Sequence, residues 1–235
     1  MRDSFIAARQ TITNTACQLF LSKGYAAVSM EDISKELRVE TDYLKLHFSN
    51  KESILDAATE TIYHDVSLIL KGFVKHEFSS LVAEEKVKIS KERLRFISPL
   101  AAENFSARMV DHLDAIFDYF ICHRVPLCVM LIEAMRPSKY ESCVDRLFSL
   151  FLPGRKNPVF EGEWELAALL TKTTMNYRMF FQTNVQPLLF YAAFEADKMK
   201  HSDSANDDNR ALVISVIRKH NMQFVQGKDI IFPNC

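Results

Sequence analysis

Apolar residues recur every three to four positions along most of the chain, the spacing of amphipathic helices. The first such stretch covers residues 4–23, and Gly24 suits its end because glycine adopts a positive φ without strain. A longer apolar stripe begins at residue 51 and reaches about residue 78. Further stretches predict helices at residues 79–95, 107–125, 127–135, 140–152, 163–183, 188–199 and 210–225. The pattern therefore predicts an all-α fold.

Residues 29–51 predict two short helices joined by a tight turn, with a third helix starting at Lys51. Ser29 and Asp32 form an N-cap with an acidic residue three positions later, and Thr41 is expected to cap the second helix. Apolar pairs four apart, which give each helix one inward face, are Ile33 with Leu37 and Leu44 with Phe48. This arrangement is that of a helix-turn-helix DNA-binding motif, although an ordinary αα-hairpin has the same spacing of apolar residues.

The composition supports long helices with few turns. Of 235 residues, 48% are hydrophobic and 18 are Phe, while Gly and Pro number only 5 and 7. A β-sandwich or an α/β sheet would need more turn residues. The formal net charge is −1, so the chain as a whole has no excess of basic residues for binding nucleic acid. Any contact with DNA must therefore come from a local surface.

The chemistry-bearing residues predict no enzyme, no cofactor and no metal. Neither a paired catalytic constellation nor a Gly-rich phosphate loop occurs, and the five scattered cysteines form no C-x-x-C pair. His112, His123, Cys122 and Cys128 leave a metal or redox site open, but core packing is the commoner explanation. With no signal peptide and no apolar run of about 18 residues, the expectation is a cytoplasmic protein with reduced thiols and no membrane partner.

The first fifty-odd residues resemble the DNA-binding domain of TetR-family transcriptional regulators. The matching positions are Ile12, Ala16, Leu19, Phe20, Gly24, Tyr25, Ser29, Met30, Ile33, Val39, Leu44, His47, Phe48, Lys51 and Glu52. The resemblance covers about a quarter of the chain. It implies a three-helix, homeodomain-like helix-turn-helix domain at residues 1–50 and a larger helical bundle at residues 51–235 that binds an effector and dimerises.

The resemblance also implies a function: a ligand-responsive DNA-binding regulator, most simply a repressor that a small apolar or amphipathic effector releases from a palindromic double-stranded operator. The protein would act as a homodimer through helices 163–183 and 209–225. The expected DNA-contacting residues are Ser29, Thr41, Asp42, Tyr43, Lys45, His47 and Lys51. The expected effector-lining residues, whose spacing is more often that of plain core, are Phe117, Phe120, Met130, Phe148, Met175, Tyr177 and Phe181.

The recognition segment departs from the family pattern at four positions. Arg38 stands where the turn usually has glycine, Glu40 where a small cap is usual, Asp42 at a position usually small, and Lys45 where a phosphate-contacting tyrosine is usual. Residues 1–51 hold seven Lys/Arg and six Asp/Glu, which is nearly neutral for a DNA-binding surface. The alternative is therefore a TetR-like helical ligand-binding or interaction protein that has lost operator binding.

Overall fold

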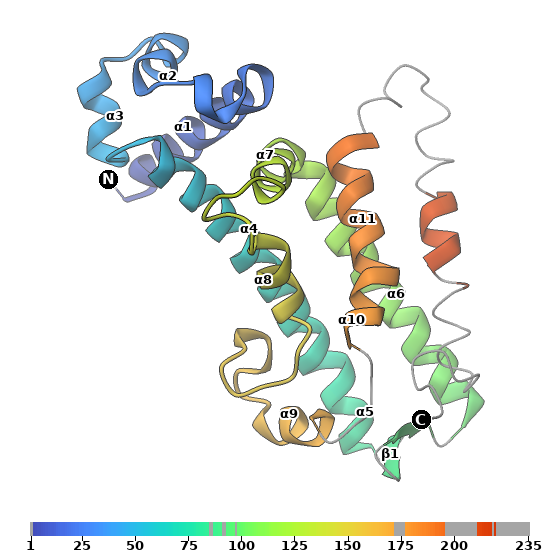
Figure 1. The fold of residues 1–235 in the computed structure, drawn as a ribbon. Helices are drawn as coiled ribbons and strands as arrows, with labels where there is room; N and C mark the ends of the chain where they lie inside the picture. The colour runs from blue at the N-terminus through green and yellow to red at the C-terminus, as the bar shows by residue number, and fades with distance from the viewer. Residues whose placement is uncertain are drawn as a thin grey trace. The chain divides into compact units, whose positions relative to one another are not determined.

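The computed structural model describes residues 2–84, 87–90, 93–96, 98–171, 177–195, 211–217 and 219, and the structural statements below refer to these residues. Apart from one short hairpin and the connecting turns, the described residues are helical (Figure 1). The elements in order are α1 (Arg2–Lys23), η1 (Tyr25–Ala27), α2 (Met30–Leu37), α3 (Thr41–His47), α4 (Lys51–Phe73), η2 (Val74–Phe78), α5 (Ser79–Ala83), β1 (Val87–Ser90), β2 (Arg93–Phe96), α6 (Pro99–Cys122), α7 (Arg124–Ala134), α8 (Cys143–Ser149), η3 (Pro158–Phe160), α9 (Trp164–Leu170), α10 (Tyr177–Phe180), η4 (Phe181–Val185), α11 (Gln186–Phe190) and η5 (Tyr191–Glu195).

By packing, the described chain divides into two compact units. One contains residues 1–64 with 122–145, and the other contains residues 65–121 with 146–235. The first unit therefore joins α1 to α3 with the first half of α4 and with α7, which comes much later in the sequence. The predicted boundary near residue 50 divides the chain by expected role, and it stays a prediction.

The core of the first unit forms where the apolar faces of α1, α2, α3 and α4 meet. Both predicted pairs contribute, because Ile33, Leu44 and Phe48 are buried there. α7 packs against α1 and adds Val129, and Tyr140 closes the cluster from the following turn. Val28, only 1% exposed, lies just before the α2 cap, where an apolar residue fixes the entry angle of the chain.

Several predicted helices have different bounds in the structure: the break expected at Pro126 lies at His123, since α7 begins at Arg124, and the helix expected at residues 140–152 is the shorter α8. The helix expected over residues 79–95 ends at Ala83, and an antiparallel hairpin follows in which Val87 pairs with Phe96. Conversely, α6 begins at Pro99, where the sequence predicts an interruption between helices. The reason is that proline in the first turn gives up no intrahelical N–H bond, and the Ser98 hydroxyl accepts from the Ala101 amide at 3.2 Å.

The second unit packs around one face of α6. Ile116, Phe117 and Phe120 on that face are at most 1% exposed. Two polar contacts join the segment before α6 to the segment after α8. The Lys71 ammonium donates to Glu161 at 2.6 Å, and the Ser79 hydroxyl donates to Glu163 at 2.7 Å.

Several predicted C-terminal elements lie partly outside the described residues. The helix expected at 163–183 appears as α9 and α10 on either side of an undescribed stretch. The helix expected at 188–199 corresponds to α11 and η5, which end at Glu195. From the segment expected at 210–225, residues 211–217 are helical, and both Leu212 and Val216 are more than half exposed.

Within the described residues, no single helix is both long and apolar enough to cross a membrane, although the bent pair α6 and α7 would satisfy those criteria by length and composition alone. The same residues include no group of three or more His, Cys, Asp or Glu side chains placed to hold a metal ion. Cys17 is buried in the first unit, and this burial raises the pKa of its thiol to about 12.

Candidate nucleic-acid interface

The start of α2 is held by a complete capping box. The Ser29 hydroxyl accepts from the Asp32 amide at 3.1 Å, and the Asp32 carboxylate accepts from the Ser29 amide at 2.9 Å and from its hydroxyl at 2.8 Å. Two of the free N–H groups at the helix start are thereby satisfied. The hydrogen bonds from Ser29 lower the pKa of Asp32 below its usual value.

The turn between α2 and α3 depends on one residue in the left-handed region. Arg38 has φ 57° and ψ 42°, and it is the one non-glycine residue with positive φ in the described chain. Its amide donates to the carbonyl of Lys35 at 3.2 Å, and the Val39 amide donates to that of Ser34 at 3.0 Å. The backbone thus adopts the geometry that glycine usually provides, with a Cβ in place.

The start of α3 is coupled to α2 through a hydroxyl pair. Glu40 is the N-cap residue and its side chain makes no capping hydrogen bond. Thr41, predicted as the cap, is instead the first helical residue, and its hydroxyl lies 3.1 Å from that of Ser34. Because Ser34 is 5% exposed, the pair fixes the contact between the two helices. This places Thr41 in the helix packing.

The outer face of α3 carries four exposed side chains. Asp42 and Lys45, three residues apart, form an ion pair at 3.0 Å in which both side chains are well exposed. Tyr43 is 41% exposed, and Leu46 is 74% exposed although it is a large apolar residue. Leu46 is not among the residues predicted from the sequence to contact DNA. The signal was present, since Leu46 falls between the inward positions Leu44 and Phe48 and so faces outward.

His47 at the end of α3 is packed between rings. Its centroid lies 4.6 Å from that of Phe5 and 5.1 Å from that of Tyr43, and its Nδ1 atom is buried without a hydrogen-bond partner. Its carbonyl accepts from the guanidinium of Arg9, which lies 3.9 Å above the centroid of the Phe48 ring. A cation from α1 therefore closes the C-terminal end of α3, where the unpaired carbonyls favour positive charge.

Lys51 is fully engaged within the protein. Its ammonium donates to the carbonyls of Tyr25 at 2.8 Å, Ala26 at 3.2 Å and Val28 at 2.9 Å, and it lies 4.7 Å from the centroid of the Tyr25 ring. An ammonium has three N–H donors, so these contacts use all of them. The N-terminus of α4 is capped separately by Asn50, whose side chain accepts from the Ser53 amide at 2.8 Å.

The seven predicted DNA-contacting residues therefore fall into two groups. Asp42, Tyr43 and Lys45 lie together on the exposed face of α3. The other four make internal contacts: Ser29 in the cap, Thr41 with Ser34, His47 between rings, and Lys51 with the η1 carbonyls.

Comparison with known proteins agrees with this geometry. Residues 12–58 match the model of the bacterial regulatory proteins of the tetR family, a range that extends from α1 into α4. The N-terminal domain belongs to the TetR family. A curated relative, the transposon Tn10 TetC protein of Escherichia coli, is 38% identical over 82 residues. This match covers 34% of the present chain and 42% of that protein, so the chain spans less than half the length of the relative it matches.

Outside the TetR-family domain, the predicted effector-lining residues are mostly core. Phe117, Phe120, Phe148 and Phe181 are buried in the second unit, where the rings of Phe148 and Phe181 lie 5.5 Å apart. Met130 is 2% exposed but belongs to the first unit. The remaining two are Tyr177, whose hydroxyl donates to the Leu170 carbonyl, and Met175, which lies outside the described residues. The effector pocket among them stays a prediction.

Proposed function

We propose that this protein is a DNA-binding transcriptional regulator, most simply a repressor that a small-molecule effector releases from its operator. The observation that carries the proposal is the exposed face of α3, held by the capping box, the turn at Arg38 and the hydroxyl pair with α2, within a domain that matches the TetR family. A helix presented in this way enters the major groove of DNA in helix-turn-helix proteins.

The side chains on this face have chemistry suited to base edges and phosphates. The Asp42 carboxylate accepts hydrogen bonds, as from cytosine N4, while the exposed Leu46 side chain suits the thymine methyl group. The Tyr43 hydroxyl and the Lys45 ammonium suit phosphates. The Asp42–Lys45 ion pair does not block this use, because an exposed pair contributes only about 0–1 kcal/mol and yields to a phosphate.

The rest of the proposal follows the family. The protein acts as a non-enzymatic, cytoplasmic homodimer on a palindromic operator, because a two-fold dimer places two α3 helices on half-sites about one DNA turn apart. The half-exposed apolar residues Leu212 and Val216 suit a partner surface within the predicted dimer segment. Effector binding in the C-terminal part would change the spacing of the two reading helices.

The test is binding of the full-length protein to DNA fragments from around its own gene, followed by selection from genomic fragments, at two salt concentrations. Lys45→Ala should weaken binding and reduce its dependence on salt, because one cation–phosphate contact is lost. The matched control is Lys35→Ala, which removes an exposed lysine from α2. Specific binding that Lys45→Ala weakens and Lys35→Ala does not would support the proposal. The absence of any selected fragment at low salt would refute operator binding.

A second function has its own observation in favour. Lys51 donates to three carbonyls and His47 is packed between rings, so two of the predicted phosphate contacts serve the fold. A TetR-like helical ligand-binding or interaction protein without an operator would keep these internal contacts and would need no DNA contacts from α3. An empty genomic selection from a folded protein would favour this function.

A further inference from the structure

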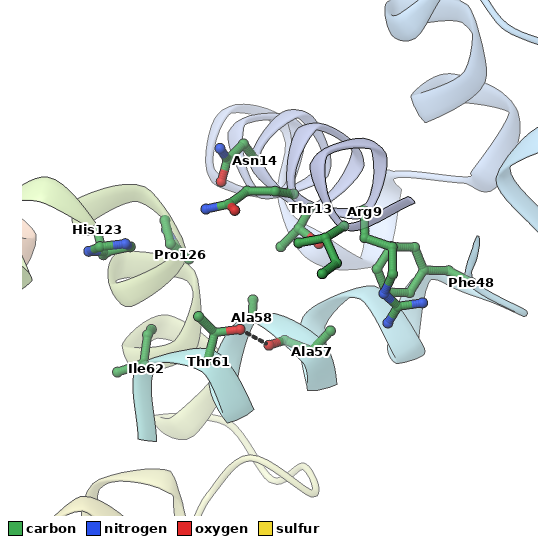
Figure 2. Close-up of a pocket in the computed structure, with 12 residues that line it drawn as sticks. Arg9, Thr13, Asn14, Phe48, Ala57, Ala58, Thr61, Ile62, His123 and Pro126 are labelled. Atoms are coloured by element: carbon green, nitrogen blue, oxygen red, sulfur yellow. Dashed lines mark hydrogen bonds between the residues drawn. The ribbon is translucent and has the colours of Figure 1, made fainter. Parts of the chain in front are cut away.

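A cavity of about 220 Å³ lies within the first unit, between α1, α4 and α7 (Figure 2). Arg9 and Thr13 line it from α1, Ala57 and Ile62 from α4, and Pro126 from α7. None of its lining residues belongs to the exposed face of α3 or to the set predicted to line an effector pocket. Figure 2 shows Arg9 beside Phe48 at one end of the cavity, with His123 and Pro126 at the other.

The lining combines one permanent cation with apolar walls. Among the twelve residues that line the cavity in the described part of the chain, none carries a carboxylate, and Arg9 carries a guanidinium. Ile62, Ala57 and Pro126 give apolar surface, while Thr13 and His123 add polar groups. A few placed polar groups in an apolar lining are typical of small-molecule sites, and this set favours an anion with an apolar body.

The volume limits the size of the ligand. An enclosed cavity of about 150 Å³ is large enough for benzene. The present cavity, which opens to solvent beside the exposed Ile6, has about 220 Å³ and therefore room for one ring with a carboxylate. Bicyclic or longer ligands would extend into solvent. We propose that this cavity binds a small single-ring carboxylic acid, with its carboxylate on Arg9 and its ring against the apolar α4 residues beside it.

The position of Arg9 links such a ligand to α3. The same guanidinium donates to the carbonyl of His47, the last residue of α3, and stacks on the Phe48 ring. A carboxylate is a stronger acceptor than a backbone carbonyl, and it pairs with guanidinium in a bidentate manner. The bound acid therefore competes for the group that closes α3. If α3 contacts an operator, as proposed above, the acid lowers operator affinity.

Calorimetric titration of the full-length protein tests the site without DNA. The probe is benzoate, and benzamide is its neutral counterpart of the same shape. Benzoate should bind, and benzamide should bind at least about tenfold more weakly, because the charge-assisted contact is lost. Arg9→Gln should weaken benzoate binding by at least about tenfold for the same reason.

Two further variants separate the cavity from general effects. Ala57→Leu fills the cavity from a partly exposed position and leaves Arg9 in place, so it should abolish benzoate binding in a protein with an unchanged circular dichroism spectrum. Lys35→Gln removes an exposed cation that does not line the cavity and should leave binding unchanged. No binding up to about 10 mM benzoate, equal binding of benzamide, or retained binding in Ala57→Leu would overturn the site.

Operator binding measured with and without saturating benzoate tests the coupling. The expected loss of affinity is about 5- to 150-fold. Benzoate binding with unchanged operator affinity would overturn the link to α3 and leave the site supported. If no DNA fragment binds under any condition, the regulator function fails, and the calorimetric result still decides whether the cavity binds the acid.

Discussion

Replacing Arg38 by glycine should stabilise the protein, although it removes a side chain from the expected DNA-binding domain. Arg38 holds φ 57° at the C-cap of α2, a conformation in which its Cβ approaches the following carbonyl. The backbone hydrogen bonds of the turn, from the amides of Arg38 and Val39, do not involve the side chain and remain in the variant.

The magnitude follows from two opposing terms. A non-glycine residue in the left-handed region costs roughly 1–2 kcal/mol. Glycine removes that cost but loses more conformational entropy on folding, roughly 0.5–1 kcal/mol. Arg38→Gly should therefore raise the free energy of unfolding by about 0.5–1 kcal/mol, which for a chain of this size is a rise in Tm of about 1–4 °C.

The assay is urea denaturation followed by circular dichroism, with Arg38→Ala as the matched control. Both variants remove the same charge, but alanine keeps the Cβ and therefore the strain. The difference between the two variants isolates the backbone conformation. If Arg38→Gly is no more stable than Arg38→Ala, the strain argument is wrong. DNA binding should change equally in both variants if only the charge of Arg38 matters there.

Three other substitutions test contacts in the first unit. Lys51→Met should lower the free energy of unfolding by about 2 kcal/mol, because three carbonyls lose a charged donor; Lys45→Met in the same urea assay should have little effect. Because the pKa of Asp32 is lowered in the folded protein, its contribution to the free energy of unfolding is present above the unfolded-state pKa near 4 and is lost as the pH falls. Asp32→Asn should therefore flatten the decline in stability at acid pH. Burial, assisted by a hydrogen bond to Asp56, raises the pKa of Tyr140. The contribution of Tyr140 to the free energy of unfolding is therefore present below the unfolded-state pKa near 10 and is lost as the pH rises. Tyr140→Phe should therefore flatten the alkaline decline, measured as Tm against pH, and an unchanged slope would contradict the assignment.

The sequence predicted the features of the helix-turn-helix whose causes are local. The capping box at Ser29, the positive φ at Gly24 and the inward faces of Ile33 and Leu44 all depend on residues a few positions apart. The outward face of α3 follows from the same periodicity. It contains Asp42, Tyr43 and Lys45 as predicted, together with Leu46, which that periodicity also exposes.

The helix predicted over residues 79–95 was wrong because its periodicity was weak. Its few apolar residues, such as Val87 and Leu94, fit either a solvated helix or a short antiparallel pair, and cross-strand pairing decided for the hairpin. Pro99 begins α6 and does not lie in a break between helices, because proline is as well suited to the first turn of a helix as to the end of the preceding one.

What only the tertiary structure decided is how the charged side chains are used. Lys51 donates to carbonyls 23 to 26 residues earlier, and Arg9 donates to a carbonyl 38 residues later. A spacing pattern shows which face of its own helix a residue occupies, but not which backbone from another segment lies within reach of its charge. For the same reason the cavity of α1, α4 and α7 has no signal in the sequence, since its walls meet only after the chain has folded. Local order was therefore determined by the sequence, and the partners of each long side chain by packing.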